Sequence, residues 1–351
     1  MRRLSDMHGL PRIPDELSAE WLTEVLRANN TLTDSRVTAF DLTQIGVFSN
    51  VIWRISLEYD RTEPHVPLVL VAKQGKPAAR IPAGTGFQTE IKFYREIAPQ
   101  LQLRVPQAYY GHYDEITGAG LLLLEYVEGS APVDFMEGIN ETHATCVIDA
   151  LAKMHAQWWQ QVAALPVLPR LADPAFRASI ATAFDRGWHG SRDYFEATHD
   201  PEFLAIGDAL VGHVADSIAA LGEPATLLHG DAHFENLPLL EENGEQDVFF
   251  HDWAATHYGH AAFDVAVFSV QSYATDSRRR REKEVVATHA DAVRAKGIEW
   301  QDPWGDYRRG VLYWMIRMLE DAELRPGAEP WIVIDRYVAA AVDLEVGELI
   351  V

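Results

Sequence analysis

The chain has 351 residues, of which 48% are apolar and 23% are charged, as in globular proteins and unlike disordered or fibrous ones. Its formal net charge of −22 disfavours a nucleic-acid-binding protein, because binding along a phosphate backbone needs a surplus of Lys and Arg. The first residues lack the apolar core of a signal peptide, and no apolar run is long enough to span a bilayer. With the single cysteine Cys146, these features predict a cytoplasmic protein that works away from the membrane.

The first part of the chain is predicted to be rich in strands. Helical periodicity, alternation and turn residues define its elements. In chain order we expect a helix over 14–28, strand, turn and strand over 37–59, a strand over 67–73, a loop over 76–86, a helix over 87–98 stopped by Pro99, and strands over 108–113 and 121–126.

After Gly129 the periodicity becomes that of long helices. These are expected over 141–162, 175–197, 203–221, 278–296, 306–323 and 331–346, with one hairpin of strands 237–240 and 247–251 joined by the turn 241–244. The layout predicts an α+β, two-lobed protein. Residues 1–127 would form a small β-rich lobe and residues 128–351 a larger helical lobe.

The most informative run extends from His229 to Asn236 and reads His-Gly-Asp-Ala-His-Phe-Glu-Asn. Asp231 and Asn236 stand five positions apart on one loop, and Asp252 follows at the far end of the next hairpin. These three side chains are expected to converge. Phosphoryl transfer needs such a set, namely a carboxylate that positions the attacking hydroxyl and oxygen ligands for Mg²⁺. Taken singly, each aspartate would more often be structural than catalytic: Asp231 would cap a turn, and Asp252 would end a strand.

The same run, followed by Asp252-Trp253 and by Gly259 and Asp264, resembles the aminoglycoside phosphotransferase and choline kinase superfamily. That superfamily has a protein-kinase-like fold, and the resemblance covers nearly the whole chain. The many Trp and Tyr residues of the helical part also resemble the branch related to ecdysteroid kinases.

The resemblance implies a role for each residue of the motif. It makes Asp231 the catalytic base, Asn236 and Asp252 the magnesium ligands, and His229 a residue that orients the loop. Asp264 would lie at the start of a core helix. Its carboxylate is expected to do no more than interact favourably with the dipole of that helix.

Lys73 and Glu90 are expected to pair in the first lobe. The helix over 87–98 has an apolar stripe, and Glu90 falls inside this stripe whereas Glu96 lies opposite. A carboxylate on a buried face needs a cation, and Lys73 at the end of an apolar strand is the candidate. A lysine held in this way places its ammonium on nucleotide phosphates, and the resemblance assigns the same two residues to this role.

Two backbone segments are expected to contact ATP. The turn between the first two strands, with Gly46, Ser49 and Asn50, corresponds to the phosphate-covering loop of the family, although it lacks G-x-G-x-x-G. The carbonyl of Glu125 and the N–H of Val127 would bind adenine at the hinge. Each segment also fits an ordinary turn or strand end.

His233 takes the position where protein kinases commonly have a lysine that contacts the γ-phosphate, so we count it among the catalytic candidates. The alternative, given equal weight, is that it packs the loop through hydrogen bonds to backbone carbonyls. Three other histidines are expected to be structural. His155 would be a core residue, and His257 and His260 would be loop residues. The basic run 278–281 is expected to be a solvated helix start.

We therefore predict an ATP- and Mg²⁺-dependent O-kinase of a small hydroxylated molecule. The identity of the acceptor stays open between an amino sugar, an amino alcohol and a hydroxylated lipid. Acidic and aromatic candidates for its site are Asp185, Asp193, Glu196, Glu320, Asp321, Trp188, Tyr194, Trp304, Tyr307, Tyr313 and Trp314. The alternative from another class is a nucleotide-binding pseudokinase that acts as a partner or scaffold protein.

Overall fold

The computed structural model describes residues 11, 13, 15–47, 50–75, 86–114, 119–127, 138–162, 168–242, 245–320 and 329–351. The chain divides into two compact units. One consists mainly of the residues up to Gly129, and the other of Ser130–Val351 together with the short segment Gln102–Arg104.

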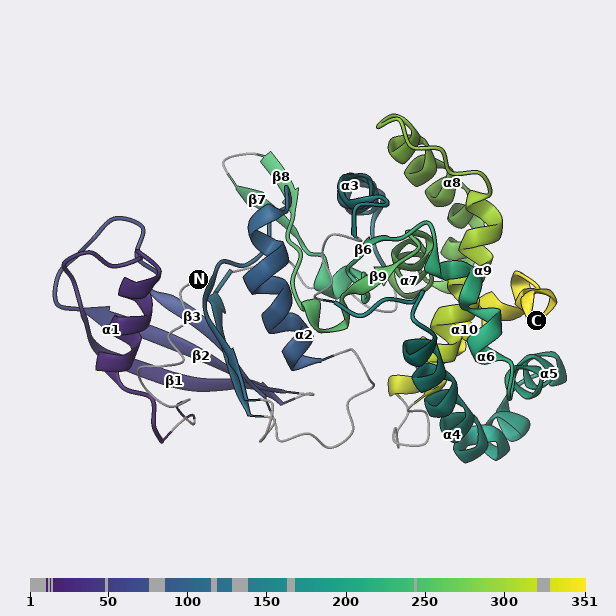
Figure 1. The fold of residues 1–351 in the computed structure, drawn as a ribbon, viewed down its shortest axis with the longest axis horizontal. Coiled ribbons are helices and arrows are strands. Elements are labelled where there is room, and N and C mark those ends of the chain that lie inside the picture. Colours follow the sequence, from purple (N-terminus) through teal and green to yellow (C-terminus); the bar gives the residue numbers. More distant parts are fainter. Residues whose placement is uncertain are drawn as a thin grey trace. The chain divides into compact units, whose positions relative to one another are not determined.

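The first unit is built on an antiparallel five-stranded sheet with the strand order β1-β2-β3-β5-β4 (Figure 1). Its strands are β1 (Val37–Val47), β2 (Asn50–Tyr59), β3 (Val69–Gly75), β4 (Ala108–Tyr113) and β5 (Gly120–Glu125). Successive side chains of a strand point to opposite faces, so Ala72 and Lys73 of β3 lie on different sides of the sheet. Ala72 belongs to a hydrophobic core that also contains Leu22 and Val25 of helix α1 (Ala19–Ala28). Lys73 faces helix α2 (Phe87–Lys92) on the other side.

Both helices of this unit depart from the predicted bounds for local reasons. Helix α1 starts at Ala19 and not at residue 14, because Ser18 caps it by accepting a hydrogen bond from the Trp21 N–H at 3.1 Å. Helix α2 is followed by a π-helical segment, Phe93–Ile97, and by a 3₁₀ turn, Ala98–Gln100, that contains Pro99. Proline has no N–H to donate along the helix, so the α pattern does not continue through it.

The second unit is mainly helical (Figure 1). Its helices are α3 (Glu141–Trp158), α4 (Pro174–Thr198), α5 (Pro201–Leu210), α6 (Val214–Ser217), α7 (Ala262–Ser272), α8 (Thr275–Arg294), α9 (Pro303–Leu319) and α10 (Glu329–Asp343). Every residue of α7 is buried, and it packs closely against α9. A Cβ atom on Gly310 of α9 would lie 2.7 Å from the Ala262 carbonyl oxygen, so glycine permits this close approach.

Two short strand pairs interrupt the helices. One pairs β6 (Thr226–Leu228) with β9 (His257–Gly259), and the other pairs β7 (Leu239–Glu242) with β8 (Glu245–Val248). The β7–β8 hairpin was predicted with a wider turn over 241–244, but the strands extend into that turn up to Glu242. The pair β6–β9 was not predicted, because strands of three residues are too short to show alternation.

The single helix predicted over 203–221 is wrong. Helix α5 ends at Leu210, and Gly212 adopts a positive φ of 78° before the short helix α6 begins. The left-handed conformation of Gly212 ends the helix, which is the usual role of a glycine at this position.

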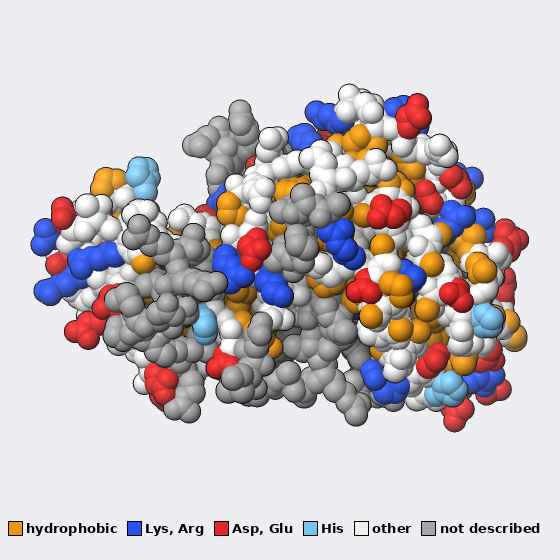
Figure 2. Space-filling view, in the orientation of Figure 1, with side chains coloured by type: hydrophobic (Ala, Val, Ile, Leu, Met, Phe, Trp, Pro, Cys, Tyr) orange, Lys and Arg blue, Asp and Glu red, His pale blue; other side chains and the backbone are white. Residues whose placement is uncertain are grey.

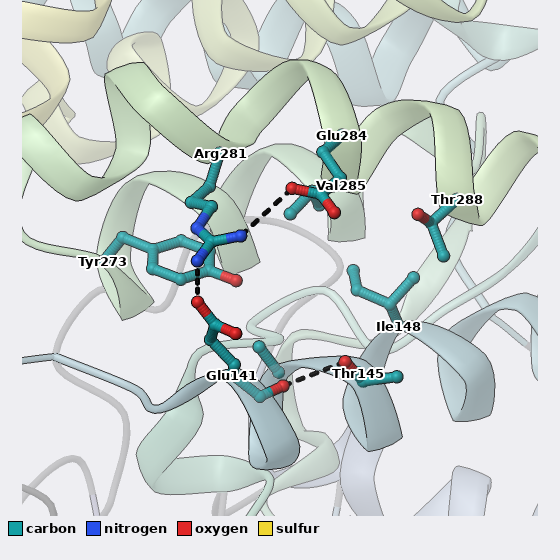
Figure 3. Close-up of a pocket in the computed structure, with 9 residues that line it drawn as sticks. Glu141, Thr145, Ile148, Tyr273, Arg281, Glu284, Val285 and Thr288 are labelled. Atoms are coloured by element: carbon teal, nitrogen blue, oxygen red, sulfur yellow. Dashed lines mark hydrogen bonds and ion pairs between the residues drawn. The ribbon is translucent and has the colours of Figure 1, made fainter.

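The prediction that residues 278–281 form a solvated helix start holds only for its outer residues. Arg278 is 1% exposed and pairs with Glu282 at 2.8 Å and with Asp343 of α10. Figure 3 shows Arg281 between Glu284 and Glu141, so this arginine connects α8 to the start of α3. The cavity beside it, about 110 Å³, is smaller than ordinary ligand sites.

The surface charge is mixed on the face drawn in Figure 2, where Lys and Arg side chains lie among Asp and Glu side chains of the described residues. In the described parts of the chain, none of the helices combines the length and apolar character that a membrane crossing requires.

Candidate active site

The loop that follows β6 is held by a buried carboxylate. Asp264, in the first turn of α7, accepts hydrogen bonds from the backbone N–H groups of His229 at 2.8 Å and Gly230 at 3.0 Å. It was predicted only as a helix-terminal charge. Burial alone would raise the pKa of Asp264, but the hydrogen bond and charge of His155 and the neighbouring His229 and Gly230 hold it below its usual value. Asp264 therefore fixes the start of the loop in position.

Two further histidines extend this contact. His155 of α3 lies with Nε2 3.0 Å from Asp264 Oδ2, and its Nδ1 lies 2.9 Å from Nε2 of His289 on α8. All three side chains are completely buried. Burial and the neighbouring His155 lower the pKa of His289 well below its ordinary value, so His289 is neutral near pH 7. The prediction that His155 is a core residue is confirmed, but its polar contacts were not predicted.

Gly230 has a conformational reason to be glycine. Its φ is 83°, and a Cβ atom there would lie 2.0 Å from the carbonyl oxygen of Ala255. The backbone therefore passes directly beside the segment that contains Asp252-Trp253. This approach brings the two halves of the motif together across the β7–β8 hairpin.

His229 is buried and holds the loop through both ring nitrogens. Its Nε2 lies 2.9 Å from the His251 carbonyl oxygen, and its Nδ1 accepts the Asp231 N–H at 3.3 Å. These partners require the tautomer with the proton on Nε2. Burial lowers the pKa of His229 despite the nearby Asp264 and Asp231 carboxylates, so the ring stays neutral. These contacts hold the ring against the loop, and the loop-orienting role that the resemblance implied for His229 stays a prediction.

Asp231 and Asn236 are in direct contact. The Asn236 Nδ2 donates to the Asp231 carbonyl oxygen at 2.9 Å and to its Oδ2 at 3.2 Å. The Asp231 side chain is 37% exposed, so its carboxylate is accessible, whereas Asn236 is buried. Because Nδ2 faces Asp231, the Asn236 Oδ1 is the atom left to bind a cation.

His233 lies beside the same pair. Its Nε2 is 3.6 Å from Asp231 Oδ2 and 3.1 Å from Asn236 Nδ2, and its Nδ1 is 3.7 Å from Glu235 Oε2. Burial alone would lower the pKa of His233, but the Asp231 carboxylate and then Glu235 outweigh burial and raise it. Among the residues that the structure describes, its ring contacts side chains and forms no hydrogen bond to the backbone carbonyls of the alternative prediction.

Asp252 is connected to the loop that contains Asn236 by a backbone hydrogen bond of the preceding residue. The His251 N–H donates to the Asn236 carbonyl oxygen at 3.1 Å, which places Asp252 one residue from a direct backbone contact with Asn236. Asp252 itself adopts a left-handed conformation, φ 63° and ψ 66°, before a 3₁₀ turn, Trp253–Ala255. A positive φ is uncommon for residues other than glycine, although aspartate adopts it more readily than most.

Lys73 and Glu90 form the predicted ion pair in the first unit. The Lys73 Nζ donates to Glu90 Oε1 at 2.7 Å, with 12% of the lysine side chain and none of the glutamate side chain exposed. Glu96 pairs instead with its neighbour Arg95 and is 39% exposed. The choice of Glu90 over Glu96 from the helical period is therefore confirmed as a contact.

The other nucleotide-binding candidates of this unit are less fully defined. Gly46 lies near the end of β1 and pairs with Ile52, and Asn50 is buried at the start of β2. Ser49 lies outside the described residues. Glu125 ends β5, where its side chain accepts the Gln107 N–H at 3.0 Å, and Val127 follows at the edge of the described segment.

Most aromatic candidates for the acceptor site are core residues. The side chains of Trp188, Tyr307, Tyr313 and Trp314 are at most 6% exposed. Glu320 is also buried and lies 3.2 Å from Arg317. Asp321 lies outside the described residues. Tyr194, which is 38% exposed, stays a candidate.

His257 and His260 were predicted as loop residues, which is wrong for His257 and holds for His260, the residue that follows β9. His257 belongs to β9, and both side chains are buried. The Nδ1 of His257 donates to the Ala255 carbonyl oxygen at 2.9 Å, and burial lowers its pKa to about 4. Sequence gave no signal for this, because burial of the segment follows from the short pair β6–β9.

The model of the Ecdysteroid kinase-like family matches residues 45–295. The chain belongs to this family. No curated protein matches it. Among solved structures it is similar to a candidate aminoglycoside phosphotransferase from Ralstonia eutropha, with 14% identity, a TM-score of 0.61 and coverage of 94% of this chain and 98% of the other.

Two further similar structures are an ethanolamine kinase from Plasmodium vivax and APH(2″)-IIa in complex with gentamicin. The first has 11% identity, a TM-score of 0.53 and coverage of 92% and 87%. The second has 13% identity, a TM-score of 0.53 and coverage of 95% and 99%. The predicted superfamily and the α+β kinase-like fold are thereby confirmed, and the chain is grouped with small-molecule kinases.

Proposed function

We propose that this member of the ecdysteroid kinase-like family transfers the γ-phosphoryl group of ATP to a hydroxyl group of a small molecule. The observation that carries the proposal is the contact of Asn236 with Asp231, together with the backbone bond from His251 to Asn236. These contacts join Asp231 to Asn236 and bring the backbone next to Asp252 to the same loop, where Asn236 and Asp252 would serve as oxygen ligands. Phosphoryl transfer requires such a set and little other chemistry from the protein.

The donor atoms at this place fit a magnesium ion. Asn236 would offer Oδ1 because its Nδ2 is occupied by Asp231, and Asp252 would offer its carboxylate. Magnesium in proteins is commonly held by one or two carboxylates and by the phosphates of its substrate. When bound, the ion would neutralise charge on the β- and γ-phosphates.

Asp231 would accept the proton of the acceptor hydroxyl through its exposed carboxylate. Its Oδ2 is held by Asn236, which leaves Oδ1 to face the substrate. His233, whose pKa is raised by Asp231, would donate a hydrogen bond to the transferred group. In the other unit Lys73, oriented by Glu90, would bind the nucleotide phosphates, and Gly46, Ser49, Asn50, Glu125 and Val127 would line the nucleotide.

The test is a phosphoryl-transfer screen with ATP and Mg²⁺ over amino sugars, amino alcohols and hydroxylated terpenoids. General-base assistance contributes about 10²- to 10⁴-fold, so Asp231→Asn should lower turnover at least about 100-fold while ATP affinity changes only a few-fold. Asp252→Ala should weaken Mg²⁺-dependent ATP binding, and Asp247→Ala on the exposed part of β8 serves as its matched control.

Retention of half of the wild-type rate by Asp231→Asn would reject the base assignment. Equal effects of the substitutions at Asp252 and Asp247 would reject the metal site. Binding of ATP without turnover of any acceptor, and without slow hydrolysis that Asp231→Ala abolishes, would favour the pseudokinase alternative.

A further inference from the structure

A second cleft lies in the helical unit, away from the proposed transfer site. It measures about 740 Å³, within the size range of ligand sites, and lies where the end of α3 meets the connection between α8 and α9. It is at the opposite end of the β6–β9 pair from the catalytic loop, because Thr226 pairs with Gly259 at the cleft end and Leu228 with His257 at the loop end. Its lining contains neither Asp231 nor Asn236.

Three aromatic rings form the inner wall of the cleft. Trp159, Trp300 and His260 all line it, and their ring centroids are separated by 6.1, 5.1 and 6.0 Å. All three side chains are more than nine-tenths buried. Only the edges of the two indoles reach the cleft, where they give it an apolar patch for a small carbon skeleton.

His260 contributes a buried donor that no described residue satisfies. Its Nδ1 accepts the Ala262 N–H at 3.2 Å, so the proton of the neutral ring is on Nε2. Nε2 has no hydrogen-bond partner among the described residues. The nearest carboxylate oxygen, Asp306 Oδ2, is 3.4 Å away without forming a hydrogen bond to Nε2, and it accepts the Trp300 Nε1–H at 2.8 Å. A buried polar group without a partner is costly, and an acceptor atom of a ligand would relieve this cost.

The mouth of the cleft is acidic. The exposed Glu223, Glu299 and Asp302 line it, Asp306 lies deeper beside Trp300 and His260, and the described lining contains no Lys or Arg. Arg309 stands behind this lining, 3.0 Å from Asp306 Oδ1 and 4.0 Å from Asp302 Oδ2. One guanidinium against four carboxylates leaves a negative field at the opening, which attracts cations and repels anions.

We propose that this cleft binds a small ammonium compound that also carries a hydroxyl oxygen. The ammonium groups would lie at the carboxylates of the mouth, the carbon skeleton on the two indoles, and the hydroxyl oxygen would accept the proton of His260 Nε2. This site is independent of the proposed transfer reaction, because none of its contacts involves the catalytic loop.

The test uses the full chain and calorimetric titration with three probes at fixed low ionic strength. The first probe, 1,3-diaminopropan-2-ol, carries two ammonium groups and a hydroxyl group. The second, 1,3-diaminopropane, lacks the hydroxyl group, and the third, glycerol, has hydroxyl groups but no charge. We expect the first to bind, the second to bind about 10-fold more weakly for loss of one hydrogen bond to a buried donor, and glycerol not to bind.

Variants assign the binding to this cleft. The double substitution Glu223→Gln with Glu299→Gln, both at exposed positions, should weaken binding of the diamino alcohol at least about 10-fold. Glu202→Gln, at an exposed position of α5, should leave this binding unchanged. His260→Phe should abolish the preference for the hydroxyl. Equal binding of both diamines to the wild-type chain, no effect of the double substitution, or no binding of the diamino alcohol below about 10 mM would overturn the proposal.

Discussion

The Nε2 atom of His155 lies 3.0 Å from Oδ2 of Asp264, and both side chains are completely buried. The same carboxylate accepts the N–H groups of His229 and Gly230. One side chain of α7 thus connects helix α3 with the loop that contains Asp231.

Asp264→Asn is expected to destabilise the chain by about 2 to 4 kcal/mol, because an amide nitrogen then faces buried N–H donors. Urea unfolding measures this loss, and hydrogen exchange of the His229 and Gly230 amides measures the opening of the loop. Asp276→Asn in the exposed first turn of α8 is the control. Unchanged exchange at both amides would contradict the anchoring role.

Gly230→Ala should be much more destabilising than Gly297→Ala. Both glycines have a φ near 80°, but only Gly230 would bring a Cβ atom to 2.0 Å from a backbone oxygen, whereas nothing lies within 4 Å at Gly297. The left-handed conformation costs a non-glycine residue about 1 to 2 kcal/mol. The difference in unfolding free energy between the two variants therefore measures the clash alone, and similar losses would show that Ala255 can move aside.

Glu90→Gln is expected to weaken ATP binding about 10-fold or more and to lower stability by about 3 kcal/mol, because Lys73 loses the charge that holds it in a buried position. Glu96→Gln, on the exposed side of the same helix, should change stability by less than about 0.5 kcal/mol. Fluorescence titration with ATP and Mg²⁺ gives the affinity of each variant. Wild-type affinity in Glu90→Gln would show that the pair is only structural.

Stability should fall on acidification from pH 6.5 towards pH 4. Burial lowers the folded-state pKa values of His257 and His260 to about 4, whereas the usual value is 6.5, so the unfolded chain binds more protons throughout this window. Each histidine should remove about 2 kcal/mol of unfolding free energy between pH 7 and pH 5. The stability that the two neutral histidines contribute is present above pH 6.5, and it is progressively lost as the pH falls below that value.

Urea unfolding at pH 7 and pH 5 measures this dependence. His257→Gln keeps a donor for the Ala255 carbonyl oxygen and removes one titrating group, so its loss between the two pH values should be smaller than that of the wild-type chain. His189→Gln, at an exposed position on α4, should follow the wild type. A parallel decline in His257→Gln would assign the acid sensitivity to other groups.

The parts of the site that depend on spacing along one element were predictable. Glu90 was chosen over Glu96 from the helical period, with the same assignment from the resemblance, and the contact with Lys73 agrees. The contact of Asn236 with Asp231 follows from their separation on one loop. Their chemical roles are still predictions.

Features that depend on distant segments were not predictable. Asp264 meets His155 across 109 positions of sequence, and Arg278 meets Asp343 across 65. Neither local periodicity nor composition encodes such pairs, because each depends on how α3, α7, α8 and α10 pack. For the same reason the tryptophans and tyrosines of the helical unit suggested a ligand site, although packing places most of them in the core.

The single cysteine provides one site for thiol-specific labelling. Cys146 is half-buried on α3, nine residues before His155, and no other thiol competes for a reagent. A maleimide dye attached there would mark the native chain at one defined point without prior mutagenesis. Because α3 contacts Asp264 through His155, the emission of that dye is expected to respond to changes in the loop that contains Asp231.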